Sequence, residues 1–181
     1  MGAGAGQGDM TGELKYTILN TNMGWIGILG SSAGLICTTL PLLSAQQAKQ
    51  QLGSRVKEAS RSDNFFADLL QRLRSYFAGH RVTFPDELDL SQATTFQCKV
   101  WEITKLIPYG ETRSYSWVAE QLGKAGAVRA VGRALARNPL PIITPCHRVV
   151  EKDGTLGGYS GGVEIKEYLL QLEASAQRVF D

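Results

Sequence analysis

The sequence has little of what marks membrane, secreted and zinc-binding proteins. Its longest apolar run, around residues 35–43, is too short to cross a bilayer and is interrupted by threonines and a proline. The three cysteines are an odd number and show neither CxxC nor His-rich spacing. We therefore expect no membrane association, no metal site, and a reducing compartment, which is the cytoplasm or, in a eukaryote, the nucleus.

A strong net charge is also missing, because 19 lysines and arginines face 17 acids and leave a net charge of +2. Any nucleic-acid-binding surface must then be local. The bases do cluster, since residues 111–148 hold six bases and two acids. Residues 1–12 are rich in glycine and carry neither a signal peptide nor a myristoylation signal, so we interpret them as a disordered tail.

A chain of 181 residues can form one domain or two small ones with a real core. In residues 13–91, three apolar runs separated by turns predict a small antiparallel sheet. Two helices follow, one capped by Ser44 and one, amphipathic, capped by Asn64 and ended by Gly79. This half gathers no nucleophile with a base and an orienting group. We interpret it as an N-terminal α/β scaffold domain.

The segment 81–91 contains Pro85 and alternating acids, which indicates an edge strand or a crossing linker. We place the domain boundary near Ser91. Residues 92–177 then form a mostly α-helical C-terminal domain. Its expected helices are residues 95–107, capped by Thr94 or Thr95, the short pair 116–122 and 128–137, and a final helix 163–174. The short pair, joined by a tight glycine-containing turn, predicts a helix-turn-helix of the winged-helix type.

Arg129, Arg133 and Arg137 recur at steps of four on the second helix of this pair. Charge at such spacing is often only a solvated face. The helix also has few bulky side chains, so it can lie close against a sugar-phosphate backbone while its arginines reach phosphates or bases. We therefore predict a DNA contact surface made of these arginines with Ala127 and Val128.

The stretch PLPIITPCHRVV, residues 139–150, carries the candidate nucleophile, Cys146. Its neighbours His147 and Arg148 create positive potential, which favours a thiolate, and three prolines stiffen the preceding loop. A lone buried cysteine is more often just a small hydrophobe. Adjacent side chains of an extended loop also point apart, so adjacency does not establish a pair of Cys146 and His147.

Glu173 lies on the final helix at the border of the apolar stripe formed with Leu169. A carboxylate there is either an ordinary surface residue or the partner that orients a histidine. In the second case Glu173 orients His147, and His147 removes the thiol proton of Cys146 directly or through a water. The same trio would suit a cysteine hydrolase, so the residues alone leave two chemistries open.

The motifs PCHRVV at 145–150, NPLP at 138–141 and GGYSGG at 157–162 resemble the active-site segment of the O6-alkylguanine-DNA alkyltransferases, the methylated-DNA–protein-cysteine methyltransferases. The resemblance runs from about Phe96 to Glu173, with a weaker match back to about Leu14. It implies DNA repair by irreversible, single-turnover transfer of a methyl or other alkyl group from O6-alkylguanine, and also from O4-alkylthymine, to Cys146. The partner is double-stranded DNA. We expect a monomer that uses no cofactor.

The resemblance also implies roles for individual residues. Cys146 corresponds to the alkyl acceptor, His147 and Glu173 to its activating partners, and Asn138 to a brace between the recognition helix and the active-site loop. Arg129 corresponds to a finger that replaces the extruded base, and extrusion is required because the alkylated oxygen lies within a stacked pair. The remaining implied contacts to the guanine are Tyr115, which also crowds a phosphate, the carbonyls of Cys146 and Val149, the Ser160 amide, and Tyr159 as a pocket wall.

Two other functions remain open. A binding-only protein could recognise alkyl damage and signal to other repair factors, as alkyltransferase-like proteins do, but those lack the cysteine that this chain has at Cys146. A cysteine hydrolase would turn over esters or amides without DNA. Its thioester would be cleaved by water, whereas a thioether formed on Cys146 would not.

Overall fold

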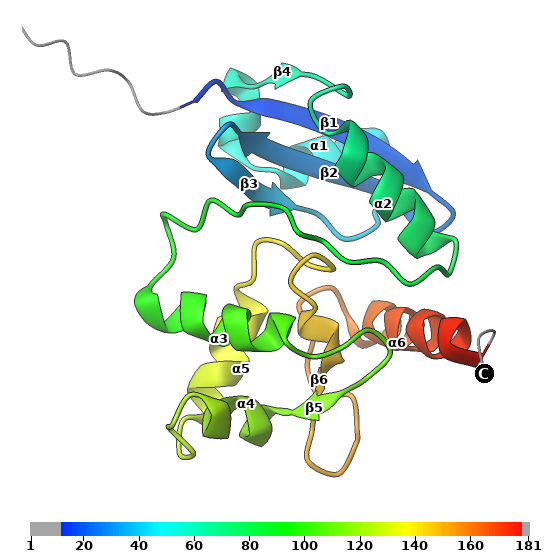
Figure 1. Cartoon of the computed structure of the whole chain (residues 1–181). Coiled ribbons are helices and arrows are strands. Elements are labelled where there is room, and N and C mark those ends of the chain that lie inside the picture. The colour runs from blue at the N-terminus through cyan, green and yellow to red at the C-terminus, as the bar shows by residue number, and fades with distance from the viewer. Residues whose placement is uncertain (1–11, 179–181) are drawn as a thin grey trace, which may run out of the picture.

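The computed structural model describes residues 12–178, so the expected tail, residues 1–12, lies outside the described residues except for Gly12. Figure 1 shows a small sheet with its helices on one side of a long linker and a group of helices on the other. The elements of the sheet layer are β1 (Lys15–Thr21), β2 (Gly24–Ser31), β3 (Gly34–Thr38), α1 (Ala45–Gln51), η1 (Ser54–Glu58), β4 (Ser60–Arg61) and α2 (Ala67–Phe77). Those of the second layer are α3 (Thr95–Lys105), β5 (Arg113–Ser114), α4 (Tyr115–Gln121), α5 (Val128–Ala136), η2 (Cys146–Arg148), β6 (Val149–Val150) and α6 (Val163–Arg178).

Three strands form the antiparallel sheet that the apolar runs predict, and the full order is β3-β2-β1-β4. A two-residue turn joins β1 to β2, because Thr21 pairs with Gly24. Gly24 has a φ of 130°, and an added Cβ would lie 2.5 Å from the Leu42 carbonyl oxygen, so glycine is required there. The sequence did not indicate β4, whose two residues pair in parallel with the start of β1.

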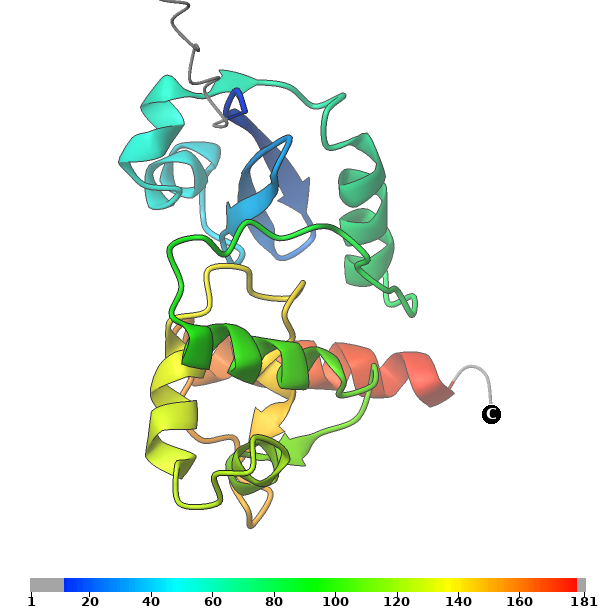
Figure 2. The same cartoon turned by 60° about the vertical axis from the view of Figure 1, so that its left-hand side comes forward.

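Two helices cover opposite faces of the sheet, as Figure 2 shows. α1 begins where the sequence predicts, since the Ser44 side chain accepts a hydrogen bond from the Gln47 amide. The predicted cap of α2 is wrong. Asn64 lies in a turn in which its carbonyl accepts from the Ala67 amide, and the helix begins only at Ala67, without a side-chain cap.

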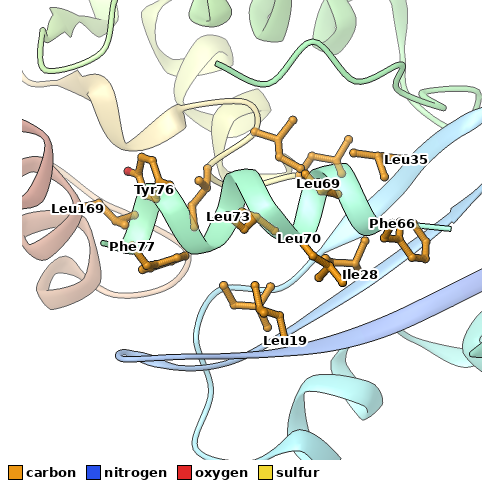
Figure 3. Close-up of a cluster of buried hydrophobic side chains, with 14 of the residues drawn as sticks. Leu19, Ile28, Leu35, Phe66, Leu69, Leu70, Leu73, Tyr76, Phe77 and Leu169 are labelled. Atoms are coloured by element: carbon orange, nitrogen blue, oxygen red, sulfur yellow. The ribbon is translucent and has the colours of Figure 1, made fainter. Parts of the chain in front are cut away.

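The buried face of α2 forms the centre of the main core (Figure 3). Leu69, Leu70 and Leu73 pack with Leu19 and Ile28 of the sheet, as the helical period predicts. The same cluster continues into the second half of the chain through Leu140, Ile142, Ile143 and Leu169. The two halves therefore share one core, and the domain boundary near Ser91 stays a prediction.

The second half contains the four expected helices with small differences at their ends. Thr94 and Gln97 form a reciprocal capping box at α3. α4 and α5 are joined by a turn in which Gly123 has a φ of 69°. α6 continues to Arg178, four residues past its predicted end at Ala174. A parallel pairing of β5 with β6 was not expected, and it ties the start of α4 to the segment after Cys146.

Residues 81–91 form the crossing linker and not a regular edge strand. One isolated bridge connects Leu88 to Leu35, where the Leu35 amide donates to the Glu87 carbonyl at 2.8 Å. The end of β3 touches the second half directly, because the Thr38 amide donates to the Pro139 carbonyl at 2.9 Å. The sheet thereby supports the loop that leads to the candidate nucleophile.

Two kinds of feature were searched for in residues 12–178, namely membrane-spanning helices and metal-binding clusters. No helix within residues 12–178 is both long and apolar enough to cross a membrane. In the same range no three or more histidine, cysteine, aspartate or glutamate side chains come together in a way that could hold a metal ion.

Candidate active site

Cys146 is the first residue of η2 and is 5 % exposed. The Asn138 side chain organises its surroundings: Nδ2 donates to Sγ of Cys146 at 2.9 Å and to the Thr144 carbonyl at 3.0 Å, while Oδ1 accepts from the Leu140 amide at 2.9 Å. One amide side chain thus joins both ends of the loop between α5 and the thiol. A donor aimed at the sulfur also stabilises negative charge there.

The loop between Asn138 and Cys146 is tightly constrained. Ile142 has a φ of 74°, a conformation that β-branched residues rarely adopt, and its side chain is 3 % exposed. Such strain persists only where the surroundings enforce it. Here the side chain is buried in the shared core, and the Thr144 amide donates to the Leu140 carbonyl at 2.9 Å. The stiff loop expected from the prolines is therefore also held by packing.

His147 and Glu173 form a fully buried pair, with 2.7 Å between Nε2 and Oε1. Because an ionised carboxylate only accepts hydrogen bonds, Nε2 carries the proton. The other ring nitrogen, Nδ1, is buried and has no hydrogen-bond partner among the described residues. No hydrogen bond between the ring and Sγ of Cys146 occurs in that range either. Nδ1 is thus the nitrogen available to accept a proton.

Glu173 is not an ordinary surface residue, because its side chain is 0 % exposed. Hydrogen bonds compensate the burial of this charge. Its two oxygens accept from Tyr76 Oη at 2.8 Å, from the Gly110 amide at 3.0 Å, and from Arg148 Nε and Nη2 at 2.9 and 3.0 Å, besides His147. The carboxylate is the centre of a buried network.

The pKa shifts follow from this arrangement. Burial raises the pKa of Cys146 to about 12, more than the hydrogen bond from Asn138 and the charge of Lys166 lower it. Burial lowers the pKa of His147. For Glu173, burial by itself would raise the pKa. The hydrogen bonds and charges of His147 and Arg148 outweigh this effect and lower the pKa of Glu173 to about 2. The resting site therefore holds a neutral thiol, a neutral imidazole and a carboxylate.

The expectation that neighbouring positive charge favours a Cys146 thiolate is therefore wrong for the resting protein. Arg148 directs its guanidinium to Glu173 and to the Ile107 carbonyl, at 2.8 Å, so its charge is already paired. Desolvation of the sulfur then dominates. A thiolate on Cys146 would form at neutral pH only if another group accepted the thiol proton.

Lys166 is a site residue that the sequence analysis missed. Its side chain is fully buried, and Nζ donates to the Leu156 carbonyl and contacts Tyr115 Oη at 3.4 Å. Burial lowers its pKa to about 8. Helix phase could have indicated it, because Lys166, Leu169 and Glu173 lie at i, i+3 and i+7 on one face of α6.

Cys146 opens into a pocket of about 560 Å³ between α5 and the segment 157–162. Gly157 lies beside it with a φ of 67°, a left-handed conformation that favours glycine. The predicted site residues that line the pocket are Tyr115, Val128, Arg129, Cys146, Tyr159 and Ser160.

Other predicted residues lie elsewhere. Val149 is fully buried and pairs with Arg113 between β6 and β5. Arg133 and Arg137 are exposed, with Arg137 as the C-cap residue of α5. Ala127, the N-cap residue of the same helix, is partly exposed. Val128, at the start of the helix, is 36 % exposed and lines the pocket.

Comparisons with known proteins agree with the geometry. The family model of the 6-O-methylguanine DNA methyltransferase DNA-binding domain matches residues 95–175. The methylated-DNA–protein-cysteine methyltransferase of Mycobacterium leprae is 54 % identical over 108 residues, which are 60 % of this chain and 65 % of that protein. The protein of the same name from Methanosarcina barkeri is 39 % identical over 165 residues, 91 % of this chain and 100 % of that protein.

The likeness to solved structures also spans both halves. The crystal structure of Mycobacterium tuberculosis O6-methylguanine methyltransferase is 38 % identical, with a TM-score of 0.75 over 93 % of this chain and 99 % of that one. The same organism's OGT in complex with DNA gives 37 %, a TM-score of 0.75, and coverage of 92 % and 99 %. The chain belongs to the methylated-DNA–protein-cysteine methyltransferase family. The match to the first relatives covers slightly less than two thirds of their length, whereas the match to Methanosarcina barkeri is complete.

Proposed function

We propose that this protein repairs alkylated DNA by transferring a methyl or other alkyl group from O6 of guanine, and from O4 of thymine, to Sγ of Cys146. One observation carries the proposal. Cys146 lines a pocket of about 560 Å³, while the histidine beside it has a fixed tautomer and an unoccupied acceptor nitrogen. Relatives named methylated-DNA–protein-cysteine methyltransferase support the substrate class.

The reaction is a displacement at the alkyl carbon. A water carries the thiol proton of Cys146 to Nδ1 of His147, and Glu173 stabilises the imidazolium that forms. The sulfur then forms a bond to the alkyl carbon as the bond from that carbon to O6 breaks, and guanine leaves with the bonding electron pair. The guanine anion then recovers, through water, the proton that His147 took from the thiol, so the imidazole returns to its neutral form and atoms and charge balance. Water does not hydrolyse the thioether, so each molecule acts once.

The electrostatics explain why the thiolate forms only in this step. Burial opposes charge on Cys146, with a pKa of about 12, and equally opposes charge on His147, whose pKa it lowers. Formation of the two charges side by side removes part of both penalties, because each becomes the counter-charge of the other. The Asn138 amide, 2.9 Å from Sγ, stabilises the developing thiolate further.

The DNA contact belongs to α4 and α5, which we assign as a helix-turn-helix of the winged type within a C-terminal domain, residues 92–177, beside an N-terminal scaffold domain, residues 13–91. Arg129 lines the pocket mouth, so it can replace an extruded base. The small residues of α5, with Ala127 and Val128 at its start, fit a minor groove. Arg133 and Arg137 are exposed and contact phosphates.

The pocket then reads the extruded guanine. Tyr115 and Tyr159 line it, and the Tyr159 hydroxyl is buried without a hydrogen-bond partner among the described residues. A planar base fits between such aromatic walls. The Ser160 amide and the Cys146 carbonyl provide the backbone contacts to the ring edge, because both residues line the pocket.

The test is a transfer assay with a duplex containing one labelled O6-methylguanine. Cys146→Ser should abolish methyl transfer to protein, because the same partners cannot activate a hydroxyl of far higher pKa. Its affinity for the duplex should change less than about twofold, since the variant preserves shape and charge. Thr144→Ser, a substitution in the same loop outside the relay, serves as the matched control. Substantial transfer by the serine variant would exclude Cys146 as the acceptor.

A further inference from the structure

Tyr76 is the one side chain of the first half that reaches the buried Glu173 network among the described residues. It lies at the last turn of α2, near Leu169 of α6, as Figure 3 shows. Its hydroxyl donates to Glu173 Oε1 at 2.8 Å and lies 3.4 Å from His147 Nε2.

The hydroxyl has defined roles in both contacts. Glu173 is ionised, with a pKa of about 2, so Tyr76 donates its single proton to the carboxylate. Its oxygen lone pairs then face the proton on His147 Nε2. Burial raises the pKa of Tyr76 well above its usual value, which keeps the donor protonated over the whole working range. Tyr76 therefore fixes the same two atoms that form the His147–Glu173 bond.

We propose that Tyr76 is a positioning residue for alkyl transfer: its hydroxyl holds Glu173 and the ring of His147 so that Nδ1 points toward the thiol of Cys146. The inference rests on the proposed function, and it gives the first half of the chain a direct part in the site. The rest of the ring is held independently, by edge contacts to Phe77 and Tyr109 with ring centroids 5.4 and 6.0 Å apart.

Because these aromatic contacts hold the ring without the hydroxyl, Tyr76→Phe is an informative variant. Phenylalanine keeps the packing and removes only the hydroxyl, and Glu173 keeps donors from His147, Arg148 and Gly110. Without the Tyr76 hydroxyl, the carboxylate of Glu173 accepts one hydrogen bond fewer and keeps more of its negative charge. This charge stabilises the imidazolium form of His147 in the resting state. The pKa of His147 should therefore rise in this variant. The charged and titratable groups that act on this histidine are Glu173, Arg148, Lys166 and Tyr76.

The first measurement is the rate of Cys146 alkylation by free O6-benzylguanine as a function of pH. Tyr76→Phe should be about fivefold slower at neutral pH, the factor expected from one ordinary hydrogen bond, and the acid limb of its profile should move to higher pH. Tyr168→Phe, which loses a hydroxyl beside the same core, is the matched control. Leu73→Val destabilises that core without touching the network.

The second measurement is independent of alkyl transfer. Nitrogen NMR of the two histidines follows the titration of His147 directly, with the exposed His80 as an internal reference. An unchanged rate and an unchanged His147 titration in Tyr76→Phe would overturn the inference. So would a slower rate reproduced by Leu73→Val without any shift of the acid limb. If the wild-type protein forms no thioether, the proposed function fails, and the NMR shift still decides whether Tyr76 controls His147.

Discussion

At the scale of single residues, burial determines the chemistry of this site more than the charges next to it in sequence. Arg148 follows the nucleophile by two positions, yet its guanidinium pairs with Glu173 and leaves the sulfur desolvated. Lys166, twenty residues away, is the cation whose charge lowers the pKa of Cys146. Its effect is smaller than that of burial. In the proposed mechanism, reactivity therefore depends on a proton acceptor, the role that we assign to His147 with its partner Glu173.

Glu173→Gln tests this dependence. A glutamine offers one acceptor oxygen, places an amide against donors, and leaves Arg148 buried without its counter-charge, so we expect a loss of about 3–5 kcal/mol in the free energy of unfolding. In the folded variant the imidazolium is less stabilised. Alkylation by O6-benzylguanine should slow at neutral pH, and its rise should move toward the ionisation of the thiol at higher pH.

Urea unfolding followed by circular dichroism gives the stability, and the alkylation rate between neutral and alkaline pH gives the profile. Glu167→Gln is the matched control, because Glu167 lies on the same helix, is exposed and bonds only Gln171 among the described residues. It should behave as the wild type. An unshifted profile in folded Glu173→Gln would mean that His147 acts without the carboxylate.

At the scale of elements, the periodic patterns gave the helices and the sheet correctly, because each has one buried face. The short pairings β4–β1 and β5–β6 were missed, since two-residue strands have no period to detect. The predicted cap of α2 was wrong, because Asn64 lies in a turn that precedes the helix. Three-dimensional contacts such as Tyr76 with Glu173, ninety-seven positions apart, leave no local signal.

The sequence motifs indicated which residues lie in the site. They did not indicate the protonation states, because these depend on burial in the folded protein. The loop around Cys146, His147 and Asn138 was found from its residues and its resemblance to a family. The protonation state of the thiol was not predictable from the sequence, because it depends on the desolvation of the sulfur in the folded protein. Lys166 was within reach of helix phase, but a buried lysine contradicts the usual distribution of residues.

The variant Arg129→Ala tests the role proposed for helix α5 in base extrusion. This arginine lines the pocket mouth, so its loss should slow repair of O6-methylguanine in a duplex by on the order of tenfold, while reaction with free O6-benzylguanine, which needs no extrusion, stays nearly unchanged. Arg137→Ala is the matched control. It should weaken duplex binding and reduce its salt dependence without this split. Equal losses of Arg129→Ala on both substrates would contradict the role in extrusion.

At the scale of the whole molecule, the two halves cooperate in one site. The first half supplies the Tyr76 hydroxyl and supports the active-site loop through Thr38, which donates to the carbonyls of Pro139 and Pro141 at 2.9 and 3.3 Å. The second half supplies the thiol, the His147–Glu173 pair and the helix α5 that we propose as the DNA contact. A shared core joins them. The first half is therefore more than the passive scaffold that its sequence suggested.

The central claim is that this molecule accepts one alkyl group on Cys146 and is then spent. The most direct measurement is the mass of the peptide containing Cys146 after incubation with an excess of duplex carrying O6-methylguanine. The account predicts a peptide heavier by one methyl in place of one hydrogen, one repaired guanine per protein molecule, and no further repair. An unmodified peptide, or continued turnover of substrate by a protein whose Cys146 stays free, would contradict it.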